Sequence, residues 1–420
     1  RVVFVSADGS RHQEIEAPEN DFILHPQILA LGVGCERGTD PSELIELAQK
    51  TLKQAGLSPQ SVACVTSLDL KSDEDAVHAL ARHFAVAARF FNAEELEALT
   101  PRLANPSKTV FKAVGCHGVA EASALAAGGP KSNLIVEKQG SKRATCAIAQ
   151  SLGVIDAASV GRPRGRLAVV GIGPGTEDWR TPEATKVLQQ ADHIVGYGLY
   201  LDLLGGLIDG KTRHQSKMTQ EEKRARKALD LAAEGKSVAL VSSGDAGIYG
   251  LATLVFELLD REDRPEWSRL DISVVPGVSA LQAAASRIGA PINHDFCAIS
   301  LSDLLTPKDQ IERRLKAAAD GDFVVALYNP VSRKRRTQLR VARKILLTGR
   351  PQETPVVLAR NLGREGETLD VITLGELTPD HADMLTLVLV GNSQTRSMAH
   401  GGAKRVYTPR GYEKKMEAKP

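Results

Sequence analysis

Four short loops are rich in glycine or in aspartate, serine, tyrosine and asparagine, and each directly follows an apolar stretch. Their sequences are GIGPG (171–175), SSGDAGIYG (242–250), PGVSA (276–280) and YNP (328–330), to which NLGREGE (361–367) adds a further polar turn. Glycine lets a backbone approach a ligand closely, and the polar side chains can orient that ligand. Ligands of open parallel sheets bind beyond the carboxyl ends of the strands. The loops therefore predict a small-molecule site at one end of such a sheet.

The glycine-rich loop departs from the usual nucleotide-binding motifs. Gly171, Gly173 and Gly175 alternate, but Thr176 takes the place of the third glycine of the dinucleotide-binding fingerprint, and no Gly-Lys-Ser/Thr follows. An ordinary Rossmann-like methyltransferase carries an acidic residue at the end of its second strand, whereas HIVGYG (193–198) ends without one. By itself, the loop is equally compatible with a tight strand-to-helix turn.

Composition argues against several other functions. The chain has 420 residues, 42% of them hydrophobic and 25% charged, which is typical of a globular protein with two or three domains. No apolar run reaches the roughly 18 residues of a membrane helix, and no signal peptide opens the chain. Five cysteines without a Cys-x-x-Cys pair favour a cytoplasmic protein. A net charge of +2, 4% aromatic residues and the lack of metal-spaced His/Cys clusters argue against nucleic-acid, membrane and metal binding.

Alternating strand and helix patterns indicate an α/β protein with mostly parallel sheets. The predicted segments are an N-terminal arm or remnant (1–22), a small α/β domain (23–150), a linker (151–165), two further α/β subdomains (166–320 and 321–412) and a polar tail (413–420). The small domain ends in a predicted hairpin over 133–150, and the alternation of ETLDVITL (367–374) predicts an antiparallel strand in the last sheet.

Residues 166 to about 412 resemble the tetrapyrrole (corrin/porphyrin) methyltransferases, the class III S-adenosylmethionine enzymes. VGIGPG, GDAGIYG, VVPGVSA and YNP stand in that family's order and spacing. The resemblance implies two α/β domains with a cleft between them, S-adenosyl-L-methionine as cofactor, S-adenosyl-L-homocysteine as product and no metal. KTRHQSKMTQE, NHDFCAISLSDLLTP, NPVSRKRR and TPRGY are similar to the branch that methylates precorrin-3B at carbon 17, with ring contraction to precorrin-4, in cobalamin biosynthesis. The cobalt-containing cobalt-factor III is the alternative substrate.

The family's motif positions imply which residues contact the ligands. Cofactor binding is implied for Pro174, Gly244, Asp245, Ile248, Tyr249, Ser279, Ala280, Tyr328, Asn329, Asn361 and Leu362. Contact with the carboxylate-bearing tetrapyrrole is implied for Gly173, Tyr197, Lys217, Arg333, Lys334 and Arg335. From Arg336 onward, the basic stretch is equally well interpreted as the exposed face of a helix.

Ring contraction asks for more than methyl transfer. Methyl transfer mainly requires positioning, whereas bond migration gains from a base that takes a hydroxyl proton. Histidine has the most suitable unperturbed pKa near neutral pH. His214, His294 and Asp303 lie in the stretches of narrower similarity and are the candidate bases, although a structural role stays open for each.

The residues before the linker resemble the C-terminal domain of the cobalamin-biosynthesis G protein, through LGVGCERGT, TSLDLKSDE and GVAEASAL. A module that hands over substrate or protects an intermediate is as well supported there as a hydrolase. The polar groups at its glycine turns are Cys35, Glu36, Arg37, Cys116 and His117.

Two alternative functions remain open. One is another enzyme of the same fold, such as a ribosomal-RNA ribose methyltransferase or a diphthine synthase, against which the attached N-terminal domain argues. The other is a protein that binds and channels a tetrapyrrole with a degenerate cofactor site, against which the intact GDAGIYG and YNP turns argue. The resemblance further implies a homodimer and contacts with neighbouring enzymes of the cobalamin pathway.

Overall fold

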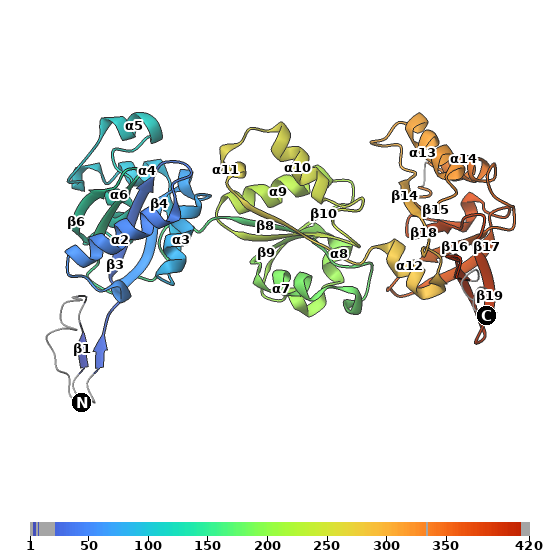
Figure 1. Ribbon diagram of the computed structural model, residues 1–420, viewed down its shortest axis with the longest axis horizontal. Coiled ribbons are helices and arrows are strands. Elements are labelled where there is room, and N and C mark those ends of the chain that lie inside the picture. The colour runs from blue at the N-terminus through green and yellow to red at the C-terminus, as the bar shows by residue number, and fades with distance from the viewer. Residues whose placement is uncertain (1–2, 6, 8–21, 333–334, 413–420) are drawn as a thin grey trace, which may run out of the picture. The chain divides into compact units, whose positions relative to one another are not determined.

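The computed structural model describes residues 3–5, 7, 22–332 and 335–412, and its strands form several separate sheets (Figure 1). The predicted α/β class is confirmed. β1 (Val3–Val5) and β2 (Phe22–Leu24) form a short parallel pair. Within these ranges, no helix combines the length and the apolar character that crossing a membrane requires.

The N-terminal domain is built on a sheet in the order β5-β4-β3-β7-β6. Its parallel strands are β3 (Leu29–Cys35), β4 (Val62–Leu68) and β5 (Ala87–Phe91). β7 (Ala144–Gln150) runs antiparallel to β3, and β6 (Asn133–Gly140) runs antiparallel to β7. β6 and β7 are therefore the hairpin that the sequence predicts.

Helices pack on both faces of this sheet, which explains why the central strand β4 is buried along its whole length. Alternate residues of β3 belong to two cores, one shared with α2 (Pro41–Gln54) and α3 (Asp75–His83) and the other with α6 (Ala120–Gly128). α6 lies very close to the sheet, because a Cβ atom on Gly32 would stand 1.9 Å from the carbonyl oxygen of Ala120. Only glycine fits at that position. The described part of the domain also contains the α-helices α4 (Ala93–Glu97) and α5 (Lys108–Val114).

Glu121, in the first turn of α6, is a buried carboxylate that is 2% exposed. It accepts hydrogen bonds from the backbone nitrogen of Asn105 (3.0 Å), from Nδ2 of Asn105 (2.9 Å) and from the backbone nitrogen of Lys138 (2.9 Å). Burial raises the pKa of Glu121, but the hydrogen bonds to the charged form outweigh burial, so the pKa is lowered from its ordinary value. The carboxylate therefore ties α6 to strand β6 and to the loop before α5.

Glu121→Gln is expected to lower the free energy of unfolding by about 1–3 kcal/mol, because backbone donors at Asn105 and Lys138 would compete for one carbonyl oxygen. Since the folded-state pKa is lowered, the carboxylate stabilises fully above the unfolded-state pKa and less as pH falls through the folded-state pKa. Urea denaturation of parent and variant at about pH 7 and about pH 3 measures both effects. A difference in stability that is equal at the two pH values would contradict the assignment.

The stretch 151–165 contains no helix or extended strand, yet it is bonded to the N-terminal domain. Arg89 of β5 donates hydrogen bonds to the carbonyl oxygens of Val160 (2.6 Å), Ala158 (3.1 Å) and Gly161 (3.0 Å). Three carbonyl contacts from one buried guanidinium hold this stretch along the edge of the sheet. The predicted linker is therefore irregular in structure but tethered.

The first sheet after this stretch has the order β10-β9-β11-β8-β12. Its strands are β8 (Arg166–Gly171), β9 (His193–Tyr197), β10 (Thr212–Ser216), β11 (Ser237–Ser242) and β12 (Asp271–Val275). Its longer helices are α7 (Pro182–Gln190), α9 (Glu221–Ala233) and α10 (Ala252–Arg261), alongside the short α8 (Gly198–Asp202) and α11 (Pro265–Ser268). α12 (Ala280–Ile288) follows β12 in sequence, but its buried residues share a core with the mixed sheet described next. The sequence does not predict β10, because this edge strand is polar and largely exposed.

The next sheet is mixed, with the order β14-β15-β18-β16-β17. Its strands are β14 (Phe296–Ser300), β15 (Val324–Tyr328), β16 (Pro355–Arg360), β17 (Thr368–Thr373) and β18 (Thr386–Val390), with helices α13 (Lys308–Asp320) and α14 (Thr337–Leu346). β17 is antiparallel to β16, as the ETLDVITL alternation predicts. β14 lies before residue 321, so this sheet includes residues that the sequence assigned to the preceding subdomain. A small sheet of β13 (Gly289–Ala290), β20 (Ala403–Tyr407) and β19 (Arg396–His400) completes the described chain.

Candidate active site

A cavity of about 210 Å³ is lined by the loops that follow β8, β11, β15 and β16 and by the start of α12. Every residue that the family's motif positions assign to the cofactor lies in its wall: Pro174, Gly244, Asp245, Ile248, Tyr249, Ser279, Ala280, Tyr328, Asn329, Asn361 and Leu362. The structure thus brings together residues from five separate stretches of sequence. Their contact with a cofactor stays a prediction.

The sequence did not single out the rest of the cavity wall, which comprises Tyr200, Ser243, Ala359, Arg364, Met384, Leu385, Thr386 and Leu387. Ser243 and Arg364 stand inside the motifs SSGDAGIYG and NLGREGE, so a residue-by-residue reading of those loops could have found them. Met384 to Leu387 carry no motif, because they belong to an apolar stretch that leads into β18.

The glycines of the loops allow one backbone to pack directly on another. Gly173 and Gly244 exchange backbone hydrogen bonds of 3.1 and 2.8 Å. A Cβ atom on Gly277 would lie 2.2 Å from the carbonyl oxygen of Gly244 and 2.8 Å from the backbone of Gly171. These glycines therefore join three neighbouring loops into one surface. Gly173, which was expected to contact the tetrapyrrole, belongs to this packing and does not line the cavity.

Asp245 organises these loops through both of its carboxylate oxygens. Oδ1 accepts hydrogen bonds from the backbone nitrogens of Gly247 (2.8 Å) and Ile248 (3.1 Å), and Oδ2 accepts one from Gly277 (3.0 Å). The following helix, α10, begins only at Ala252, so Asp245 caps a turn of the loop rather than that helix. The carboxylate is an acceptor that shapes the cavity wall.

The cavity wall concentrates unusual backbone geometry. Tyr249, Asn329 and Asn361 line it with φ angles of 54°, 50° and 51°, in the left-handed region. Asparagine tolerates this region, whereas tyrosine there is strained, and such strain gathers at functional sites. The Tyr249 and Tyr328 rings lie 5.1 Å apart between centroids. Burial raises the pKa of both phenols, so both remain neutral at physiological pH.

The three candidate bases lie outside the cavity wall. His214 of β10 places Nε2 at 2.9 Å from Nδ1 of His193 on the neighbouring strand β9. His294 accepts a hydrogen bond from the backbone nitrogen of Asp295 at 2.9 Å. None of these residues, nor Asp303, is part of the cavity lining.

Asp303 and the basic stretch form a separate cluster. Asp303 accepts a hydrogen bond from Nε2 of Gln338 (2.8 Å) and lies 3.6 Å from both Lys308 and Arg335. Arg335 also donates to the carbonyl oxygen of Asn329 (2.8 Å), so it supports the loop after β15. Arg335 therefore has a structural role in this loop, whether or not it also binds substrate.

The other residues that were expected to contact the substrate differ in their surroundings and in how far the structure describes them. Tyr197 packs edge-on against Tyr200, a cavity residue, with 5.2 Å between ring centroids. Lys217 is exposed, and its backbone nitrogen bonds to Gln220. Arg333 and Lys334 lie outside the described residues. Contact with substrate stays a prediction for all of them.

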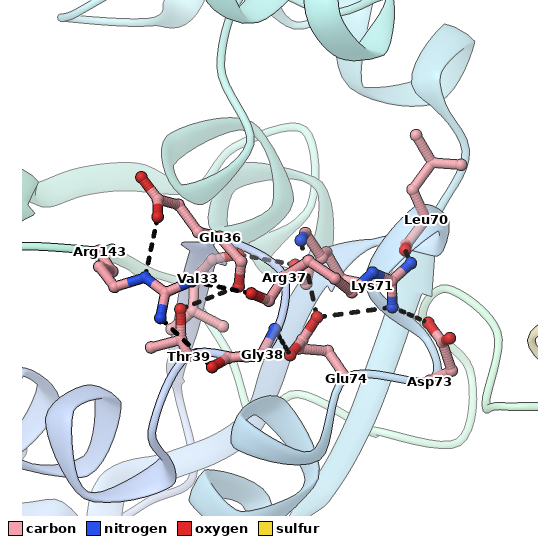
Figure 2. A network of polar contacts seen from close by, with 11 residues as sticks. Val33, Glu36, Arg37, Gly38, Thr39, Leu70, Lys71, Asp73, Glu74 and Arg143 are labelled. Atoms are coloured by element: carbon pink, nitrogen blue, oxygen red, sulfur yellow. Dashed lines mark hydrogen bonds and ion pairs between the residues drawn. The ribbon is translucent and has the colours of Figure 1, made fainter.

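A second polar cluster lies at the carboxyl end of β3 in the N-terminal domain (Figure 2). The buried Glu74 accepts a hydrogen bond from the backbone nitrogen of Gly38 (2.7 Å) and lies 3.5 Å from Arg37 and 3.7 Å from Lys71. Arg37 also pairs with Asp73 at 2.6 Å. The cluster pairs its cations with carboxylates and so stabilises the loop after β3.

The thiols of this domain are poor nucleophiles. Burial raises the pKa of both Cys35 and Cys116, which keeps the thiols protonated. His117 does not serve as a base for Cys116, because its contacts are with other residues. Its Nδ1 lies 2.9 Å from Glu97, and its ring stacks on that of Phe111 with 4.5 Å between centroids. Among the described residues, no three His, Cys, Asp or Glu side chains gather as metal ligands.

The sequence matches two known families. The profile of the Tetrapyrrole (Corrin/Porphyrin) Methylases matches residues 166–378, and that of the Cobalamin synthesis G C-terminus matches residues 29–149. The chain belongs to the tetrapyrrole methylase family, whose cofactor is S-adenosylmethionine, and it carries a cobalamin synthesis G C-terminal domain before the methylase region. Both resemblances drawn from the motifs are confirmed.

Individual members of the tetrapyrrole methylase family are similar to the methylase region of this chain. The methylase region is 44% identical over 249 residues to the precorrin-3B C(17)-methyltransferase of Sinorhizobium sp, which covers 59% of this chain and 97% of that protein. It is 42% identical over 252 residues to the cobalt-factor III methyltransferase of Priestia megaterium, which covers 60% of this chain but 46% of that protein. The crystal structure of the methyltransferase CobJ matches with a TM-score of 0.55 and 42% identity, over 58% of this chain and 100% of that one.

The chain spans about half the length of several relatives. Besides the Priestia protein, the cobalamin biosynthesis protein CobIJ of Mycobacterium tuberculosis is 44% identical but matched over only 48% of its length. Similarity to these relatives therefore supports, but does not by itself show, the activity of this chain.

Proposed function

We propose that this protein transfers a methyl group from S-adenosylmethionine to carbon 17 of precorrin-3B, with contraction of the ring to precorrin-4. The observation that carries the proposal is the cavity, in which the residues at the family's cofactor positions meet. The 44% identity to a precorrin-3B C(17)-methyltransferase over 97% of that relative supports the particular substrate. Cobalt-factor III is the second candidate, because relatives of similar identity from Priestia and Salmonella carry that name.

The residues of the cavity fit the proposed cofactor. Ile248, Ala280 and Leu362 offer apolar surface for an adenine ring, and the neutral Tyr249 and Tyr328 add aromatic faces. The wall is held by backbone packing and by Asp245, so it is formed before a ligand arrives. Bound S-adenosylmethionine supplies an electrophilic methyl group on its sulfonium.

Within this proposal, the chain acts chiefly by positioning. In-line displacement needs two centres at near-attack distance and little water, and such positioning contributes about 7–11 kcal/mol in favourable cases. The loops that would position the cofactor contain Tyr249, Asn329 and Asn361, whose left-handed backbone conformation fixes the shape of these loops. Ring contraction further requires a proton acceptor, for which His214, His294 and Asp303 remain the candidates that we propose.

The purified protein is expected to move labelled methyl from S-adenosylmethionine to precorrin-3B and to release a contracted product. Parallel incubations with cobalt-factor III separate the two candidate substrates, and product mass and absorption spectra read the outcome. A protein that binds S-adenosylhomocysteine but methylates neither macrocycle would contradict the carbon-17 assignment. Absence of S-adenosylhomocysteine binding in calorimetry would contradict the methyltransferase assignment altogether.

We also propose a cytoplasmic homodimer in which the N-terminal domain hands over or protects a reactive tetrapyrrole. The domain's match to the cobalamin synthesis G C-terminus supports a role in the same pathway. The protonated thiols of Cys35 and Cys116 favour handling of the intermediate over covalent hydrolysis. Light scattering of the purified chain measures the oligomeric state, and a monomeric mass would contradict the dimer.

A further inference from the structure

Among the residues that the structure describes, Arg364 is the one arginine in the wall of the cavity described above. It follows β16 by four residues, in the loop NLGREGE. Its Nε donates a hydrogen bond to the carbonyl oxygen of Pro174 (2.7 Å), and its Nη2 donates one to Oγ of Ser243 (2.8 Å). Two loops distant in sequence therefore fix the orientation of this side chain.

The positive charge of Arg364 has no carboxylate partner within 4.0 Å among the residues that the structure describes. Glu367, three positions along the chain, is bonded instead to the backbone nitrogen of Gly363 (2.7 Å) and to Arg287 (3.2 Å). Burial lowers the pKa of Arg364 from its ordinary value, which means that its surroundings do not compensate the charge. The ring centroid of the half-buried Tyr200 lies 5.9 Å from the guanidinium carbon.

The guanidinium still has donors to offer. Arginine carries five N–H groups in a planar fork. Two are bonded to Pro174 and Ser243, so three remain on the terminal nitrogens. A fork held in place by two protein bonds loses little freedom when it binds a ligand, and its geometry matches the two oxygens of a carboxylate.

We propose that Arg364 is a specificity-determining residue that binds a carboxylate group of a ligand in this cavity. The inference rests on the proposed function, because that function supplies two ligands with carboxylates. One source is the amino-acid end of S-adenosylmethionine, and the other is an acidic arm of the tetrapyrrole. In either case the ligand supplies the counter-charge that the protein does not.

The test compares two variants with the parent protein. Arg364→Gln removes the charge but keeps an N–H donor for the Pro174 carbonyl, and Arg364→Lys keeps the charge but loses the fork. Arg261→Gln, at an exposed position at the end of α10 and outside the cavity wall, is the matched control. Calorimetry measures affinity for S-adenosylhomocysteine and for 5′-methylthioadenosine, which lacks the amino-acid end. Steady-state assays measure KM for precorrin-3B.

Two outcomes support the proposal and tell the sources apart. If Arg364 binds the cofactor, Arg364→Gln loses about 10- to 100-fold affinity for S-adenosylhomocysteine and none for 5′-methylthioadenosine. If it binds the macrocycle, both nucleoside affinities persist while KM for precorrin-3B rises by a similar factor. Arg364→Lys should show a smaller change of the same kind, and it carries the test alone if the Gln variant does not fold.

Other outcomes overturn it. Parent-like values for both nucleosides and for KM mean that Arg364 binds no ligand. Equal losses for S-adenosylhomocysteine and 5′-methylthioadenosine mean that Arg364 only holds the Pro174 and Ser243 loops together. A parent protein that binds neither nucleoside overturns the proposed function itself, a result that differs from the failure of Arg364 alone.

Discussion

Asp245→Ala is expected to weaken S-adenosylhomocysteine binding by about 100-fold. The carboxylate accepts hydrogen bonds from Gly247, Ile248 and Gly277, and each such bond contributes on the order of 0.5–1.5 kcal/mol. Without it, the loops after β11 and β12 lose their shared acceptor, and the cavity wall must be ordered when the ligand binds. Calorimetry at constant ionic strength measures the change.

Two further variants make the Asp245 experiment specific. Asp245→Asn keeps one carbonyl oxygen as an acceptor and should lose less affinity than the alanine variant. Asp192→Ala changes an exposed aspartate outside the cavity wall and should match the parent. A folded Asp245→Ala protein with the parent's affinity would refute the role assigned to this carboxylate.

Removing the base of ring contraction is expected to lower the ratio of contracted to merely methylated product by about 10²–10⁴-fold. Methyl transfer should survive, because it depends on positioning, and affinity for S-adenosylhomocysteine should not change. His214→Ala, His294→Ala and Asp303→Asn test the three candidates one at a time. Mass and absorption spectra of the products distinguish a methylated, uncontracted macrocycle from the contracted one.

The surroundings of the three side chains supply the controls. His193→Ala removes the ring that lies 2.9 Å from His214, so it separates loss of a base from loss of its orientation. Gln338→Leu removes the donor to Asp303 but leaves the carboxylate in place. If all three primary variants contract the ring at the parent rate, none is the base, and a substrate carboxylate or bound water must accept the proton.

Much of the candidate site could be predicted from local sequence. Glycines, an aspartate and asparagines at strand ends mark loops that need close backbone approach or left-handed φ angles, as Gly277, Asn329 and Asn361 illustrate. These requirements concern the backbone of single residues, so the choice of glycine or asparagine at a position indicates them directly. The order of the loops along the chain then identified the family, and the residues at its cofactor positions do line one cavity.

Other properties were decided only by tertiary structure. The sequence could not predict that Arg364 meets Pro174 and Ser243, which lie 190 and 121 positions away, or that His214 and His294 lie outside the cavity wall. An exposed arginine and a buried one, or a catalytic and a structural histidine, are the same residue type in the same local pattern. Their roles depend on which distant groups the folded chain places beside them, since hydrogen bonds and charge compensation act over a few ångströms in space regardless of separation in sequence.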